Sequence, residues 1–117
     1  MGLLNKKIKK TEISNSANPE HAVIINFNYG IQGLEQLHEL EKKLEIVIKQ
    51  NSVGEYDGHE IAVDYSDGSI YMYGPDAETL FNAIRPTLDN TSFMKGAQAI
   101  LCFGPPDKNT RQIEITI

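Results

Sequence analysis

The chain has 117 residues, of which 40% are hydrophobic and 23% are charged, an ordinary composition for one globular domain. It holds no run of about 18 apolar residues, the length that a membrane helix needs, and its first residues lack the apolar core of a signal peptide. Because Cys102 is the one cysteine, an internal disulfide is excluded and a cytoplasmic location is expected.

The formal net charge of −5 is unevenly distributed along the chain. Four of the 11 basic residues stand near the start of the chain (Lys6, Lys7, Lys9 and Lys10). The rest of the chain therefore contains 7 basic residues (11 − 4) and all 16 acidic residues. An acidic surface repels phosphate backbones, and we therefore expect no nucleic acid as a partner. We interpret residues 1–19 as an irregular basic leader and residues 20–117 as a single domain.

Hydrophobic periodicity predicts the first two elements. From His21 to Tyr29 the side chains alternate, with Val23, Ile25 and Phe27 on one side, which is typical of a strand with one buried face. Residues 31–50 change to helical spacing, with apolar residues at steps of three and four. These residues are Leu34, Leu37, Leu40, Leu44, Val47 and Ile48.

Two further strands form a predicted hairpin around the dipeptide Asp67-Gly68. Alternating apolar runs stand on either side of this dipeptide, which is typical of a two-residue hairpin turn because glycine adopts positive φ readily. Such a turn places Val63 opposite Met72 on the side that faces the helices.

A second predicted helix starts at residues 74–76, where proline and aspartate are favourable in the first turn. Its apolar face consists of Ala77, Leu80, Phe81, Ile84 and Leu88. Pro86 predicts a kink or an end of this helix near Ile84, because proline lacks the backbone donor and clashes with the preceding turn.

Residues 97–103 and 112–117 are predicted as two last strands, joined by a turn at residues 104–107. The resulting order β-α-β-β-α-β-β is typical of a ferredoxin-like α+β fold with an extra C-terminal strand. In this fold two helices cover one face of an antiparallel sheet. Right-handed crossovers place the first and third strands in the interior of the sheet, and we expect the fifth strand to pair with the fourth at an edge.

The sheet face without helices is the first candidate site. We expect it to carry a candidate interface of six residues: Ile24, Asn26, Asn28, Asp64, Tyr71 and Tyr73. Tyrosines at i and i+2 on the third strand are typical of the RNA recognition motif, where rings stack on bases. That motif also places Lys or Arg beside the rings, and none occurs between Lys49 and Arg85. A face that packs on a second copy or on a protein partner is therefore favoured over RNA binding.

The second candidate site is a cluster of ionisable residues: Glu55, Asp57, His59, Glu60 and Arg85. Carboxylates and an imidazole bind divalent metals or small ligands, or act as acid and base. The same segment is also typical of a turn at Asp57-Gly58, and His21 and His38 stand in no metal-ligand spacing with it. The sequence does not decide between a ligand site and a turn at this segment. We predict no catalytic residue, no metal and no cofactor.

Four motifs together resemble an uncharacterised family of small bacterial proteins. They are G-E-Y-D-G-H-E at residues 54–60, Y-M-Y-G-P-D-A at 71–77, L-F-N-A-I-R-P at 80–86 and G-P-P at 104–106. The resemblance covers about residues 22–117. It implies a cytosolic stand-alone domain to which no activity is assigned, so it transfers no role to any residue.

The sequence thus predicts a non-enzymatic protein-interaction or regulatory domain, acting as a homo-oligomer or with a protein partner and without a membrane partner. Self-association is expected through the open sheet face or through the edge strand at residues 112–117. The alternative is a small-molecule or metal-binding protein that uses residues 55–60 together with Arg85.

Overall fold

The structure is a computed structural model that describes residues 20–105 and 109–117. The expected basic leader, and part of the turn predicted at residues 104–107, lie outside the described residues. The elements are β1 (His21–Asn28), α1 (Glu35–Asn51), β2 (Glu55–Ile61), β3 (Asp67–Gly74), α2 (Ala77–Asp89), the short 3-10 helix η1 (Ser92–Met94), β4 (Gln98–Cys102) and β5 (Gln112–Thr116).

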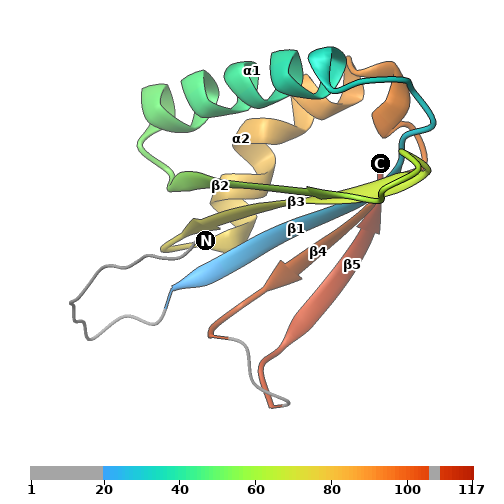
Figure 1. The fold of residues 1–117 in the computed structure, drawn as a ribbon. Coiled ribbons are helices and arrows are strands. Elements are labelled where there is room, and N and C mark those ends of the chain that lie inside the picture. The colour runs from blue at the N-terminus through green and yellow to red at the C-terminus, as the bar shows by residue number, and fades with distance from the viewer. Residues whose placement is uncertain (1–19, 106–108) are drawn as a thin grey trace.

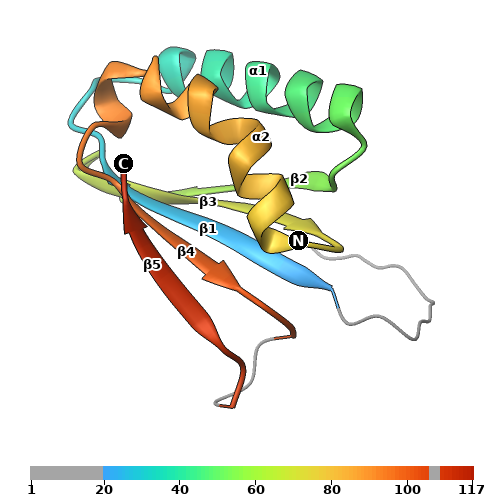
Figure 2. The same ribbon diagram turned by 180° about the vertical axis from the view of Figure 1, so that it is seen from behind.

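The five strands form one antiparallel sheet in the order β2-β3-β1-β4-β5, and both helices lie on the same face of it (Figure 1). This arrangement confirms the predicted ferredoxin-like α+β fold. β1 and β3 are interior strands, and the additional strand β5 pairs with β4 at one edge, as expected. Figure 2, the view from behind, shows β4 and β5 spreading away from the two helices.

The hydrophobic core lies between the helices and the sheet. Val23, Ile25 and Phe27 of β1 are at most 3% exposed, whereas the intervening Asn26 is exposed to solvent. The apolar stripes predicted for the helices are buried as well: Leu37, Leu40, Leu44 and Ile48 in α1, and Ala77, Leu80, Phe81, Ile84 and Leu88 in α2. Burial of each large aliphatic side chain contributes about 1.5–3 kcal/mol, so this layer fixes both helices on the sheet.

The helix ends follow local backbone chemistry. α1 begins four residues later than the predicted start at residue 31, because Gly30 and Gly33 adopt φ of 68° and 85° and keep the connection irregular. It ends at Ser52, which has φ of 52°, and the N–H groups of Ser52 and Val53 satisfy carbonyls of the last turn. Asp76 caps α2, where its carboxylate accepts from the amides two and three residues later at 2.9 and 3.2 Å.

The predicted end of the second helix near Ile84 is wrong, because α2 continues through Pro86 to residue 89. Proline removes one backbone donor but keeps its carbonyl, which accepts from the N–H of Asn90 at 3.2 Å. Leu88 in this last turn is fully buried. The packing of Leu88 therefore outweighs the one lost hydrogen bond.

The turn between β2 and β3 also differs from the prediction. The chain reverses over residues 62–66, where Tyr65 has φ of 63°, and Gly68 lies inside β3 opposite Ile61. The prediction that Gly68 has positive φ in a two-residue turn is therefore wrong. A side-chain carbon at Gly68 would lie 2.5 Å from Cδ1 of Ile61 and 3.1 Å from Cζ of Phe27, so packing inside the sheet requires this glycine.

The predicted pair Val63–Met72 is wrong for the same reason. Val63 is fully exposed in the loop, and Met72 pairs with Tyr56. Tyr71 and Tyr73 nevertheless point away from the helices as predicted. Their orientation depends on the pairing of β3 with β1 and is unaffected by the position of the turn.

Candidate functional site

The sheet face without helices, here called the open face, carries apolar side chains in two neighbouring rows. In one row Ala22 of β1 lies between Tyr73 of β3 and Cys102 of β4. In the next row Ile24 of β1 lies between Tyr71 of β3 and Ile100 of β4. We call these six residues the apolar patch: Ala22, Ile24, Tyr71, Tyr73, Ile100 and Cys102.

Polar groups border the apolar patch. Asn26 lies in the following row between Ser69 and Gln98, and the Ser69 hydroxyl donates to Oδ1 of Asn26 at 2.5 Å. The side-chain amide of Gln98 donates to the hydroxyl of Thr116 at 3.0 Å. Exposed carboxylates stand at both sides of the sheet: Glu55 and Glu60 on β2 and Glu114 on β5. The open face therefore combines an apolar centre with acidic borders.

The ionisable side chains of the apolar patch are held in their neutral forms. The hydroxyl of Tyr71 donates to Oε1 of Glu60 at 2.6 Å, and this bond is the main cause that raises the pKa of Tyr71. Burial is the main cause that raises the pKa of Tyr73, and burial also raises the pKa of the Cys102 thiol. At neutral pH the apolar patch therefore consists of uncharged rings and a protonated thiol that is 7% exposed and is not a nucleophile.

Of the residues predicted for the interface, Ile24, Asn26, Tyr71 and Tyr73 lie together on the open face, and Asn28 lies at the end of β1 opposite residue 67. The structure does not bring Asp64 to them. Asp64 belongs to the loop at residues 62–66, where its carboxylate accepts from the backbone N–H two residues later at 3.0 Å.

Sequence reasoning missed Ala22, Ile100 and Cys102. The signal was present in the alternation of residues 97–103, which puts Ile100 and Cys102 on one side of a strand. Pairing of that strand with β1 then brings both residues beside Ala22 and Ile24.

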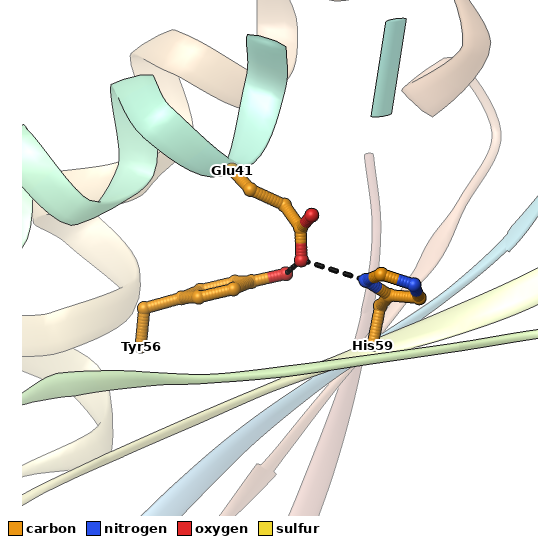
Figure 3. Close-up of polar contacts among 3 residues, drawn as sticks. All are labelled: Glu41, Tyr56 and His59. Carbon is orange, nitrogen blue, oxygen red and sulfur yellow. Dashed lines mark hydrogen bonds and ion pairs between the residues drawn. The ribbon is translucent and has the colours of Figure 1, made fainter. Parts of the chain in front are cut away.

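On the opposite face, Glu41 of α1 reaches down to the edge strand β2. One oxygen of its carboxylate accepts from the hydroxyl of Tyr56 at 2.5 Å and from Nδ1 of His59 at 2.8 Å (Figure 3). The side chains of His59 and Glu41 are 26% and 14% exposed. The ring of His38, also on α1, lies 6.1 Å from the His59 ring between centroids.

A β-bulge brings Tyr56 and His59 to the same side of β2. Residues three apart in a regular strand point to opposite faces. Here Tyr56 and Gly58 pair with consecutive residues of β3, so Asp57 is an extra residue that reverses the alternation. Gly58 has φ of 148°, a conformation that favours glycine. The Asp57-Gly58 dipeptide thus marks a bulge inside a strand and does not reverse the chain.

The chemistry of this cluster is that of a structural connection. Burial, then the hydrogen bond to Glu41 and the nearby carboxylates, raise the pKa of Tyr56 above its ordinary value of 10.0. Tyr56 therefore acts as a donor at neutral pH. A carboxylate that orients an imidazole is also part of many nucleophilic sites, but Cys102 lies on the open face of β4, away from this pair. The cluster ties α1 to the edge of the sheet.

The structure does not bring the residues of the predicted ligand cluster together. Glu55 and Glu60 point to the open face, since they pair with Tyr73 and Ser69, whereas His59 points to the helix side. Arg85 lies on α2, where its guanidinium carbon is 5.5 Å from the centroid of the Phe81 ring and its Nε is 3.8 Å from a carboxylate oxygen of Asp89. Within residues 20–105 and 109–117, no group of three or more His, Cys, Asp or Glu is placed to hold a metal ion.

A groove of about 580 Å³ extends the open face beyond the polar row. It lies where β1 and β2 end and where β3 and β4 begin. Its polar lining includes Asn26, Asn28, Glu60, Asp67, Ser69, Lys95 and Gln98. The open face therefore changes from apolar to polar along the direction of the strands.

The fold and the open face define this chain as a ferredoxin-like α+β protein with a partly apolar sheet face that neither of the two described helices covers. Comparison of the chain with protein-family models, with curated proteins and with solved structures gave no match. Among the helices that the structure describes, none is long and apolar enough to cross a membrane.

Proposed function

We propose that this protein is a non-enzymatic protein-interaction domain that binds its partner through the apolar patch of the open face. The observation that carries the proposal is contiguity, because the six residues occupy neighbouring positions on three adjacent strands. Ile24, Tyr71, Tyr73 and Ile100 are partly exposed and supply the contact surface, whereas Ala22 and Cys102 are 8% and 7% exposed and fill the space between them. Tyr71 and Tyr73 offer a large contact area with few rotatable bonds, which makes tyrosine frequent at interfaces.

The borders of the apolar patch indicate the chemistry of the partner. Carboxylates stand on both sides of it, and the whole chain carries a formal charge of −5. A complementary protein surface has an apolar centre surrounded by lysine or arginine. Attraction between such surfaces speeds association and weakens as salt is added.

The neutral side chains of the apolar patch support binding in preference to catalysis. The Cys102 thiol has a raised pKa and the Tyr71 hydroxyl donates to Glu60, so neither is activated as a nucleophile. A lone cysteine also supports the cytoplasmic location that belongs to this proposal.

The test compares two double variants of the full chain. Tyr71→Asp with Tyr73→Asp introduces charge into the apolar patch, and Ile46→Asp with Val63→Asp introduces the same charge at apolar side chains outside it that are 55% and 101% exposed. The immobilised wild type and both variants are incubated with an extract of the source cells. A captured protein is then purified, and its affinity is measured by calorimetry at low and high salt.

We expect the control variant to bind as the wild type does, with an affinity that falls as salt rises. The Tyr71→Asp and Tyr73→Asp variant is expected to bind at least about 30-fold more weakly, the effect of losing a central contact worth about 2 kcal/mol. A partner that binds this variant and the wild type equally, or a wild type that captures no protein, would contradict the proposal.

The alternative of a small-molecule or metal site at residues 55–60 with Arg85 has less support. Its side chains point to two faces of β2, and Arg85 is engaged with Phe81 and Asp89 on α2. A thermal-shift screen against divalent metals and common metabolites tests it, since a ligand that binds the native state raises the unfolding midpoint.

A further inference from the structure

The two edges of the sheet are built differently. The edge at β2 is interrupted by the bulge at Asp57 and carries three exposed carboxylates, features that hinder the pairing of a further strand. The edge at β5 has an unbroken register with β4, and Glu114 is the one charged residue within it. Among the described strands, β5 is therefore the edge that is open to another strand.

The free backbone groups of β5 have a defined direction. The N–H of Phe103 donates to the carbonyl of Arg111 at 3.0 Å, and the N–H of Ile117 donates to the carbonyl of Ala97 at 2.8 Å. Residues 111 and 117 thus direct backbone hydrogen-bonding groups towards β4. Along an antiparallel edge strand, successive residues direct their N–H and C=O groups alternately towards the paired strand and away from it. The even-numbered residues therefore direct their N–H and C=O groups away from the sheet: Gln112, Glu114 and Thr116.

The odd-numbered residues place a stripe of isoleucines on the helix side: Ile113, Ile115 and Ile117. All three are partly buried against the core. The backbones of α1 and α2 do not approach β5, which forms the edge of the sheet that points away from the helices in Figure 2. The stripe therefore leaves apolar surface within reach of a strand that pairs with β5.

We propose that β5 pairs antiparallel with β5 of a second copy of this chain, joining two five-stranded sheets across a two-fold axis at Ile115. In this register Glu114 of each copy lies opposite Thr116 of the other, and their outward backbone groups form the hydrogen bonds. Ile113 lies opposite Ile117 of the other copy, so the two isoleucine stripes become continuous on the helix side.

The occupant is a second copy because β5 itself meets each requirement of a pairing strand. The outward N–H and C=O groups of β5 recur at every second residue, so two antiparallel copies of β5 can bond to each other. The isoleucine stripes of both copies then lie on the same face of the joined sheet, as the symmetry of a two-fold contact requires. An axis at Glu114 is less favourable, since it places two carboxylates directly opposite each other. This contact uses no residue of the apolar patch, so its test is separate from that of the proposed function.

Charge substitutions at Thr116 test both the contact and its register. Thr116 is exposed on the open face, and Thr116→Glu and Thr116→Lys lose the same hydrogen bond from Gln98, which makes them a matched pair. In the proposed register the new glutamate lies opposite Glu114 of the other copy, twice in each dimer, whereas the new lysine forms two opposite-charge pairs. Gln112→Glu adds the same charge outside the paired stretch and serves as the control.

The dimer dissociation constant of each full-length variant is measured by sedimentation equilibrium. We expect Thr116→Glu to raise it about tenfold, Thr116→Lys to lower it, and Gln112→Glu to leave it unchanged. Combining Thr116→Glu with Glu114→Lys should restore dimerisation. A chain that stays monomeric at millimolar concentration overturns the proposal. The proposal is also overturned if the dissociation constant is the same for every charge at position 116 while Tyr71→Asp with Tyr73→Asp dissociates the dimer. That result places self-association on the open face.

Discussion

Gly68 is expected to tolerate no side chain, although its φ lies outside the left-handed region that requires glycine. An added carbon would lie 2.5 Å from Cδ1 of Ile61 and 2.7 Å from the carbonyl oxygen of Glu60. The Ile61 side chain can rotate away, but the Glu60 carbonyl belongs to the paired backbone of β2 and must shift. We therefore expect Gly68→Ala to lower the free energy of unfolding by about 1–3 kcal/mol, the usual cost of an extra carbon in a packed interior.

The order of two substitutions at Gly68 tests this reason. In a turn at positive φ asparagine would be tolerated better than alanine, whereas in a crowded strand the larger asparagine costs more. Urea unfolding of both variants, followed by circular dichroism, measures the difference. Gly104→Ala is the control, because its nearest neighbour would be 3.6 Å away and its stability should stay near that of the wild type. An asparagine variant more stable than the alanine variant would refute the packing argument.

Three further predictions concern local contacts. Because the folded-state pKa of Tyr56 lies above 10.0, the stabilisation that it provides is complete below pH 10 and is lost as pH rises, by up to about 1.4 kcal/mol per pH unit. Urea unfolding between about pH 9 and 11 should therefore show a flatter decline for Tyr56→Phe than for the wild type, and equal slopes would exclude this role. Asp76→Ala removes the cap of α2 and should cost about 1 kcal/mol in chemical unfolding, whereas Glu78→Ala, in the same exposed turn, should cost a few tenths. Ser52→Gly relieves the left-handed conformation at the end of α1 and should stabilise the fold by about 0.5–1 kcal/mol, and an unchanged thermal midpoint would speak against it.

The fold was predictable because its main elements carry strong periodic patterns. Alternation in residues 21–29 and the leucine spacing in α1 each indicate one buried face, and the order of elements then restricts the topology. The turn after β2 was not predictable by the same means. Asp67-Gly68 has the composition of a tight turn, but Gly68 is explained by crowding against another strand, which no local pattern reveals.

The residues of the candidate sites also divide into those that the sequence pattern predicts and those that it does not. The two tyrosines of the apolar patch follow from alternation alone, whereas Cys102 joins them only through the pairing of β4 with β1. Glu41 is beyond sequence reasoning because its contact with Tyr56 and His59 requires the bulge at Asp57. Without that extra residue the two side chains would point to opposite faces.

The central position of β1 has a consequence for synthesis of the chain. Ile24 pairs with Tyr71 on one side and with Ile100 on the other, which are 47 and 76 residues further along (71 − 24 and 100 − 24). Contacts between such distant residues close large loops and form slowly. On a ribosome β1 emerges with an apolar side and two unpaired edges, and it gains its second neighbour only after β4 has been made. A nascent chain halted before residue 98 therefore presents a template for aggregation and a binding segment for chaperones.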